Sequence, residues 1–259
     1  MRRTKILVAY LLLSLATVAG AQNRMLPIDD RPMPGRVPST RPVAFVDVTV
    51  IPMTFEGVLE HQTVVTMHGR IDAIGPVDEV DLPVGAITID GRDRYLMPGL
   101  ADMHTHLDKG HIWPRAANPN GSFTGALDTV REDRTANWRA ADVAARMDFS
   151  LRSAFAHGTA AIRTHLDSPA PQDRISWPVF EELREAWADR IELQGVSLIG
   201  CESYDQILSE YAPTADIVAE VGGVLGMVTY PVHDVRQRIL DLFELAGQRG
   251  LELDFHSDE

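Results

Sequence analysis

The sequence predicts an α/β protein: an incomplete (β/α)8 barrel of the TIM type with about five β/α units, preceded by a small β-sandwich-like domain. Strand-like and helix-like segments alternate after Pro98, and the last four strands recur about every 30 residues, the size of one β/α unit. Three strands place apolar residues on one face and ionisable residues on the other. This pattern favours a barrel over an open doubly wound sheet, whose strands are apolar on both faces.

The barrel elements follow from hydrophobic periodicity and from glycine and proline positions. Strands are expected at residues 100–106, 160–166, 191–199, 223–230 and 251–256. Helices are expected at residues 140–157, 178–190, around 217–220 and at 233–249. Gly158 suits the end of the first helix, and Pro178 suits the first turn of the second. Each helix would then connect two parallel strands.

The amino terminus has the pattern of a secretory signal peptide, which we place at residues 1–21. Arg2, Arg3 and Lys5 precede an apolar run, and Ala19-Gly-Ala21 forms a small-residue cleavage pattern. The apolar run is short for a membrane span. The protein is therefore expected to be periplasmic or secreted. The alternative is an uncleaved segment that anchors it to the membrane.

Three further segments follow the signal peptide. Prolines mark residues 22–42 as a linker. Short strands with turn signals, among them His68-Gly69, indicate the small β domain at residues 43–97. Residues 98–259 form the amino-terminal part of the barrel.

Composition narrows the class of partner. The 259 residues carry a formal net charge of −13, which argues against nucleic acid and anionic membranes. A small-molecule substrate is therefore expected, with no stable membrane partner after signal cleavage. Cys201 is the only cysteine, so a disulfide within the chain and a cysteine-rich metal site are excluded. The sequence leaves open whether the chain forms a homo-oligomer.

A His-x-His pair ends the first barrel strand. Residues two apart on a strand point to the same face, so His104 and His106 converge on one side. Two imidazoles placed in this way can hold one divalent metal ion, which needs at least a third ligand. By itself the pair also fits an incidental pair of surface histidines.

Three segments together resemble the metal-dependent amidohydrolase superfamily, in its cytosine deaminase-like branch. Residues 98–109, PGLADMHTHLDK, are similar to the family's first barrel strand, and residues 157–167, HGTAAIRTHLD, to its second. Residues 253–259, LDFHSDE, are similar to the His-x-x-Glu of its fifth strand. The resemblance covers about residues 43–259, because the family also carries a small β domain before the barrel.

The resemblance implies roles for six residues. His104, His106 and His256 would bind one divalent metal ion, with zinc or iron suited to such ligands. Glu259 would be the catalytic proton shuttle, and an ordinary solvated acid at the chain end is the alternative. His165 and Asp167 would lie beside the ligands and orient them or the substrate. A polar pair without a catalytic part is the alternative for these two.

The implied function is hydrolytic deamination of a nitrogen heterocycle or cyclic amidine. The metal makes water nucleophilic, and a carboxyl group carries the proton to the leaving ammonia. One alternative is a secreted amidohydrolase that cuts cyclic or peptide C–N amide bonds. Another is an inactive barrel fragment.

The chain departs from the family pattern in two ways. The family completes its site with a sixth-strand histidine and an eighth-strand aspartate, whereas this sequence ends after the fifth strand. We therefore expect a fragment that is inactive or poorly folded alone. Residues 197–202 lack the glutamine with which cytosine deaminases read the pyrimidine, so cytosine is a doubtful substrate. Residues 109–138 are expected to form a long loop that either covers the site or is a solvated excursion.

Overall fold

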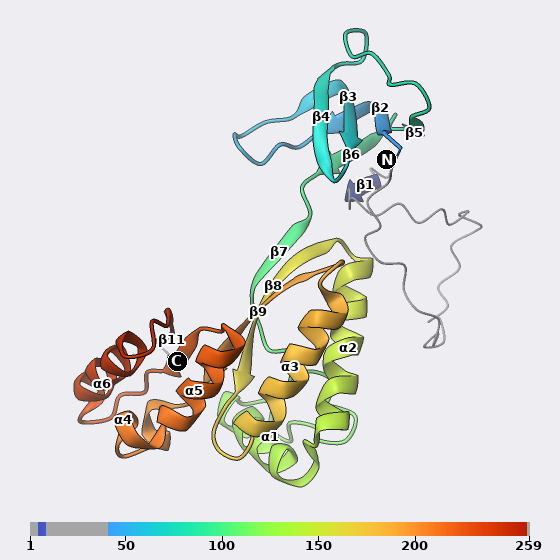
Figure 1. Ribbon diagram of the computed structural model, residues 1–259. Coiled ribbons are helices and arrows are strands. Elements are labelled where there is room, and N and C mark those ends of the chain that lie inside the picture. The colour runs from blue at the N-terminus through green and yellow to red at the C-terminus, as the bar shows by residue number, and fades with distance from the viewer. Residues whose placement is uncertain (1–4, 9–40, 258–259) are drawn as a thin grey trace. The chain divides into compact units, whose positions relative to one another are not determined.

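The computed structural model describes residues 5–8 and 41–257, and the chain divides into two compact units at residue 100 (Figure 1). The α/β class is confirmed, since the first unit is built of strands and the second alternates strands with helices. Within these residues, no helix has the length and apolarity needed to cross a membrane.

The described part of the first unit is a six-stranded sheet. Its path is β1-β6-β2-β3-β4, and β5 also pairs with β2. The bounds are β1 (Lys5–Val8), β2 (Val43–Val50), β3 (Leu59–Met67), β4 (Arg70–Pro76), β5 (Ile87–Asp90) and β6 (Arg94–Met97). The predicted turn at His68-Gly69 joins β3 to β4, and both residues have positive φ angles, as a tight hairpin turn requires.

The core of this unit lies along its central strands. Val48, Val50, Val64 and Leu96 form a buried cluster against which Phe45 packs. Strand β6, which supplies Leu96, has only four residues. Strand β1 falls inside the predicted signal peptide, whose other residues lie outside the described ranges.

The second unit contains five strands in sequential order. Their bounds are β7 (Leu100–Thr105), β8 (Thr159–Asp167), β9 (Glu192–Leu198), β10 (Leu225–Val228) and β11 (Leu253–His256). Strands β7, β8 and β9 form one sheet, β10 and β11 form another, and two parallel bridges join β9 to the β10 region. The pairs β8–β9 and β10–β11 are parallel.

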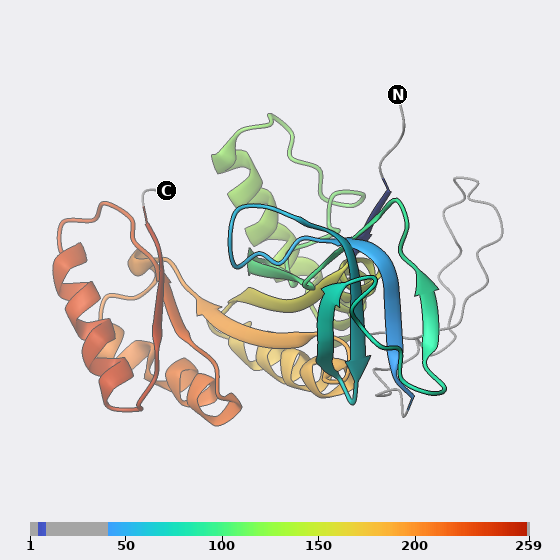
Figure 2. The same ribbon diagram turned by 90° about the horizontal axis from the view of Figure 1, so that it is seen from above.

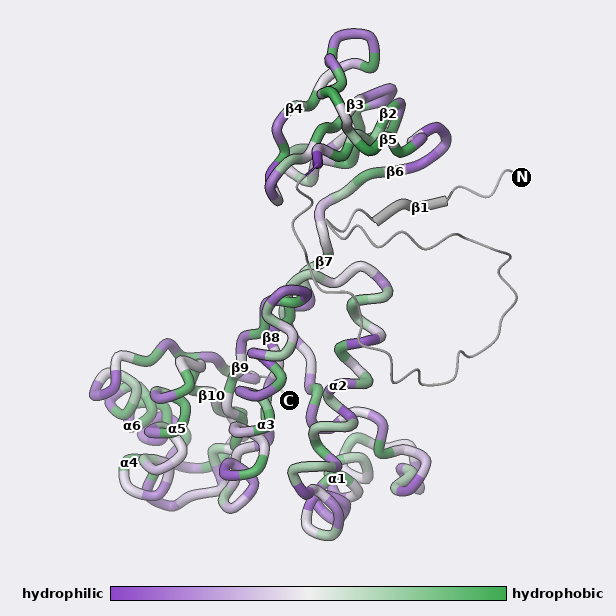
Figure 3. The backbone as a smooth tube through the Cα atoms, turned by 45° about the vertical axis from the view of Figure 1, so that its right-hand side comes forward, coloured by the Kyte–Doolittle hydropathy of each residue, from purple (hydrophilic) through white to green (hydrophobic). Residues whose placement is uncertain are grey.

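Helices connect these strands. Their bounds are α1 (Phe123–Asn137), α2 (Ala140–Ala156), α3 (Asp173–Trp187), α4 (Ile207–Glu210), α5 (Ala212–Val221) and α6 (Val235–Gly247), with a 3-10 turn η1 (Cys201–Ser203). Figure 2 shows α6 beside the β10–β11 pair. Hydrophobic and hydrophilic stretches alternate along the helices in Figure 3, as expected for helices with one buried face.

The prediction of a loop at residues 109–138 was partly wrong, because the second half of this segment is helix α1. Ser122 caps this helix by accepting a hydrogen bond from the Gly125 amide at 3.0 Å. Only Gly125 and Asp133 of α1 are buried, so the sequence carries almost no apolar stripe there. The helix is held instead by polar contacts, among them two hydrogen bonds from Arg115 to the buried Asp133 carboxylate.

The start predicted for the helix at residues 178–190 was also wrong. Helix α3 begins at Asp173, so Pro178 lies inside it and not in its first turn. Pro178 faces solvent, while its neighbours Trp177 and Val179 are buried. Burial of the preceding turn outweighs the one backbone hydrogen bond that a proline removes.

Two glycines let the aromatic face of α3 approach the sheet. Gly195 on β9 and Gly223 before β10 both lie against Trp177, which is fully buried. A Cβ atom at Gly223 would lie 2.6 Å from a ring carbon of Trp177 and 3.1 Å from the Gly195 carbonyl oxygen. No side chain larger than hydrogen fits there without a shift of the helix.

We predict that Gly223→Ala lowers the free energy of unfolding by about 1–3 kcal/mol, because overpacking forces α3 away from the sheet. Chemical denaturation followed by circular dichroism measures this change. Gly247→Ala in α6 is the matched control, since its Cβ would meet nothing within 4 Å. It should be neutral or stabilising by up to about 1 kcal/mol. Equal midpoints for the two variants would contradict the packing argument.

Candidate metal centre

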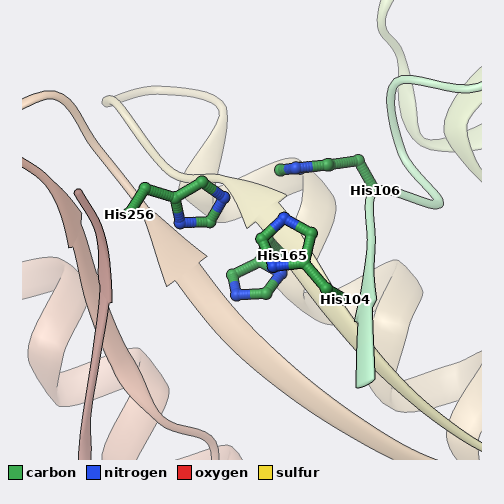
Figure 4. Close-up of side chains that lie close together, drawn as sticks. All are labelled: His104, His106, His165 and His256. Atoms are coloured by element: carbon green, nitrogen blue, oxygen red, sulfur yellow. The ribbon is translucent and has the colours of Figure 1, made fainter. Parts of the chain in front are cut away.

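Four imidazoles from three strands meet at one place (Figure 4). His104 lies on β7 and His106 just beyond it, His165 lies on β8, and His256 ends β11. Their candidate ligand nitrogens all lie within 4.8 Å of one another. The alternation of side chains along each strand explains the convergence, because His104 and His106 share a face and His165 shares one with Asp167.

His165 is part of this cluster and not behind it. Its ring centroid lies 4.3 Å from that of His104 and 4.6 Å from that of His256. The His104 and His256 centroids are 4.6 Å apart. His106 lies slightly farther away, with centroid separations of 5.3–5.5 Å from the other three rings. The structure thus brings the three predicted ligands together and places His165 among them.

Several ring nitrogens of the cluster have no hydrogen-bond partner in the described part of the chain, which leaves them available to a metal ion. Nδ1 of His106, Nδ1 of His165 and Nε2 of His256 are buried and make no hydrogen bond to the described residues. Buried polar atoms without a partner are costly unless a ligand satisfies them. Two nitrogens around one tetrahedral zinc ion lie roughly 3.4 Å apart, so small ring movements would let the cluster share an ion. An all-imidazole donor set suits zinc, iron, copper or nickel over magnesium or calcium.

Burial lowers the pKa values of His106, His165 and His256 and so favours their uncharged forms. It lowers the pKa of His106 to about 3, with a further contribution from the Lys109 ammonium. Burial also lowers the pKa of His256 to about 4, and the neighbouring His165 and His104 act in the same direction. Neutral imidazoles carry the lone pairs that bind metals.

Asp167 is close by but engaged elsewhere. Its buried carboxylate lies 2.6 Å from the Lys109 ammonium and 2.5 Å from an Arg134 guanidinium nitrogen. Burial acts to raise the pKa of Asp167, but these two cations outweigh it and the pKa is lowered. Asp167 therefore holds the segment after His106, and holds α1 through Arg134, and it contributes no atom to the histidine group.

Asp108 is fully buried next to the backbone of Asp167. One of its carboxylate oxygens accepts a hydrogen bond from the Asp167 amide at 2.8 Å, and the other has no partner among the described residues. Burial, and then the charge of Asp167, raise the pKa of Asp108 to about 7. The two carboxylates thus divide their roles, with Asp167 ionised and Asp108 much less acidic than usual.

Two functional candidates went unrecognised in the sequence. Asp254 accepts a hydrogen bond from His165 Nε2 at 3.2 Å and pairs with Arg163 at 2.8 Å. The sequence feature that could have identified Asp254 is its position two residues before His256, on the same strand face. Arg134 had no signal, because the helix that carries it was not predicted. The predicted proton shuttle Glu259 lies outside the described residues, and its role stays a prediction.

Comparison with known proteins identifies the relatives of this chain. It is 50% identical over 217 residues to a pterin deaminase of Rhizobium rhizogenes. The aligned segment covers 82% of this chain and 48% of the relative. The predicted resemblance to amidohydrolase-superfamily deaminases is confirmed. The chain thus spans about half the length of this relative. No family model matches the chain.

Solved structures agree on the fold. A 5-methylcytosine deaminase of Klebsiella pneumoniae matches 84% of this chain and 51% of its own, with a TM-score of 0.64 and 21% identity. An N-isopropylammelide isopropylaminohydrolase of Burkholderia multivorans matches 84% of this chain and 53% of its own, with a TM-score of 0.62 and 24% identity. At these identities the likeness concerns the fold alone.

We predict that acid destabilises the metal-free chain. His106 and His256 have folded-state pKa values of about 3 and 4, below the ordinary 6.5, so the unfolded chain binds more protons as the pH falls below about 6.5. The free energy of unfolding should decrease progressively from pH 7 to pH 4. Denaturation midpoints at pH 7.5 and pH 5.0 measure this.

Matched variants separate the cluster from the other ionisable groups. His106→Asn and His256→Asn should each reduce the drop in midpoint between the two pH values. His68→Asn, in the exposed turn after β3, should leave the drop unchanged. A drop of the same size in every variant would show that the cluster imidazoles are not the groups responsible.

Proposed function

We propose that this chain forms the amino-terminal part of a metal-dependent hydrolytic deaminase acting on a nitrogen heterocycle, with a pterin as the specific substrate. One observation carries the proposal: four imidazoles from three strands converge where a metal ion would be held. The 50% identity to a pterin deaminase gives the substrate class.

The proposed architecture is an incomplete (β/α)8 barrel of about five units behind a small β domain. Strands β7 to β11 follow one another in sheet order without a reversal, as in a barrel and unlike a doubly wound sheet. The histidines lie at or near the carboxyl ends of strands β7, β8 and β11, where barrel enzymes place their sites. The sixth-strand histidine and eighth-strand aspartate would belong to further units.

A pterin fits the chemistry expected of such a site. It carries an exocyclic amine on a ring carbon flanked by two ring nitrogens, which is a cyclic guanidine, an amidine with one further nitrogen. Water adds to that carbon, the C–N bond to the amine breaks, and ammonia leaves, so that one pterin and one water give one 2,4-dioxopteridine and one ammonia. The missing pyrimidine-reading glutamine is consistent with a ring other than cytosine.

The residues of this chain would divide the work. His104, His106 and His256 would hold the metal ion, which when bound supplies the Lewis acidity that makes water a nucleophile near neutral pH. Asp167 and Lys109 hold the chain that follows His106 in place through their 2.6 Å ion pair. Glu259, three residues beyond His256, would carry the proton to the departing amine.

We also propose export of the protein. Cleavage after Ala21 would release β1 together with the signal peptide and leave β6 at the edge of the sheet. Amino-terminal sequencing of the protein from the periplasm or culture medium tests this, with Gln22 as the expected first residue. A mature protein that still begins at Met1 would favour the membrane-anchored alternative.

A chimera tests the catalytic proposal. In the chimera, this chain replaces the matching segment of the Rhizobium rhizogenes pterin deaminase. The relative supplies the rest of its own length, about half. We expect this chimera to release ammonia from pterin, and the 259-residue chain alone to release none. His104→Ala and His256→Ala in the chimera should lower the rate by roughly a hundredfold or more, because each removes a metal ligand.

Product analysis gives the contradicting outcomes. His68→Asn is the control and should retain full activity, because His68 lies in an exposed turn of the other unit. A folded, metal-loaded chimera that leaves pterin unchanged would refute the substrate. Ring opening with a new carboxylate, in place of ammonia release, would favour the amide-hydrolase alternative.

A further inference from the structure

We propose that His165 binds the metal ion directly through Nδ1, and that Asp254, clamped by Arg163, is the positioning residue that turns this nitrogen toward the ion. This chain would then supply four imidazole ligands by itself. The inference rests on the proposed metal-dependent function, but its test needs no deaminase activity.

The position of His165 is the first argument. Its side chain is 1% exposed, and its centroid lies within 5.4 Å of the centroid of each of the other three rings. It is as close to His104 and His256 as those two are to each other. A residue that only supported the ligands from outside would not lie among them.

The hydrogen bond to Asp254 is the second argument. A carboxylate can only accept, so the 3.2 Å contact between Asp254 Oδ1 and His165 Nε2 places the ring proton on Nε2. The lone pair of the neutral ring then lies on Nδ1, which is buried without a hydrogen-bond partner among the described residues. Metal-binding histidines commonly donate their other ring N–H to a carboxylate in this way.

Asp254 is itself held in place. Arg163 donates to its second oxygen at 2.8 Å, and the same guanidinium donates to the Gln194 side chain at 2.6 Å. Arg163 and His165 lie on β8, whereas Asp254 lies on β11, with β9 and β10 between them in sheet order. The network therefore spans non-adjacent strands and fixes the distance between the strands that carry His165 and His256.

The nearby acids do not offer a simpler fourth ligand. Asp167 is occupied by Lys109 and Arg134. Asp254 is occupied by Arg163 and His165. In the described part of the chain, the group of residues able to share an ion consists of histidines alone.

Cobalt binding to the 259-residue chain tests the proposal. Metal-depleted protein is titrated with Co²⁺, and the visible absorption bands report the number and kind of ligands at saturation. We expect wild type to bind one Co²⁺ and His165→Ala to lose at least about 100-fold in affinity and to show a changed spectrum at saturation. Asp254→Asn should weaken binding by about 10–100-fold, because the ring is no longer oriented.

Two controls separate ligation from a structural role. Glu252→Gln makes the same acid-to-amide change just before β11 and should leave cobalt binding unaltered. Far-ultraviolet circular dichroism checks that each variant retains the fold. Added imidazole should restore the wild-type spectrum of His165→Ala by occupying the vacated ligand position, which it could not do for a misfolded site.

The results that would refute His165 as a ligand differ from those that would refute the proposed deaminase function. A wild-type cobalt spectrum in saturated His165→Ala would overturn the proposal, and so would a folded wild-type chain that binds no cobalt. A chimera that fails to deaminate pterin while cobalt binding still depends on His165 would refute the function and leave the ligand assignment standing.

Discussion

The site depends on keeping the buried imidazoles of the histidine cluster uncharged although they lie close together. Positive rings with centroids 4.3–5.5 Å apart would repel one another strongly in a buried environment. Burial prevents this by lowering the pKa values of His106, His165 and His256. The result is a set of lone pairs facing one another, which is unfavourable in isolation and favourable around a cation. Four of the nine histidines of the chain lie in this cluster.

Charged residues around the cluster hold its parts in register. The Asp167 carboxylate joins the segment after β7 to helix α1 through Lys109 and Arg134, and Asp254 joins β8 to β11 through Arg163 and His165. Both carboxylates connect elements that are distant in sequence. These two carboxylates are thereby engaged by cations and by His165, and the group of described residues that could share a metal ion consists of imidazoles.

Most of the strands could be predicted from the sequence, because a period of two residues and the flanking glycines are local properties. The helices whose burial is weak or unusual could not. Helix α1 buries only Gly125 and Asp133, so it shows no apolar stripe, and α3 begins before Pro178 because Trp177 packs against Gly195 and Gly223. In both cases the deciding contacts come from residues far away in the chain.

Sequence alternation is enough to show which side chains share a strand face. Alternation along single strands placed His104 with His106, His165 with Asp167, and Asp254 with His256. Which of these residues come into contact depends instead on how the strands pack in the fold. His165 joins the histidines because β8 lies beside β7 and because Asp254 reaches it from β11, whereas Asp167 turns to Lys109 and Arg134. Strand periodicity fixes a direction, but a distance between two strands depends on the packing of everything between them.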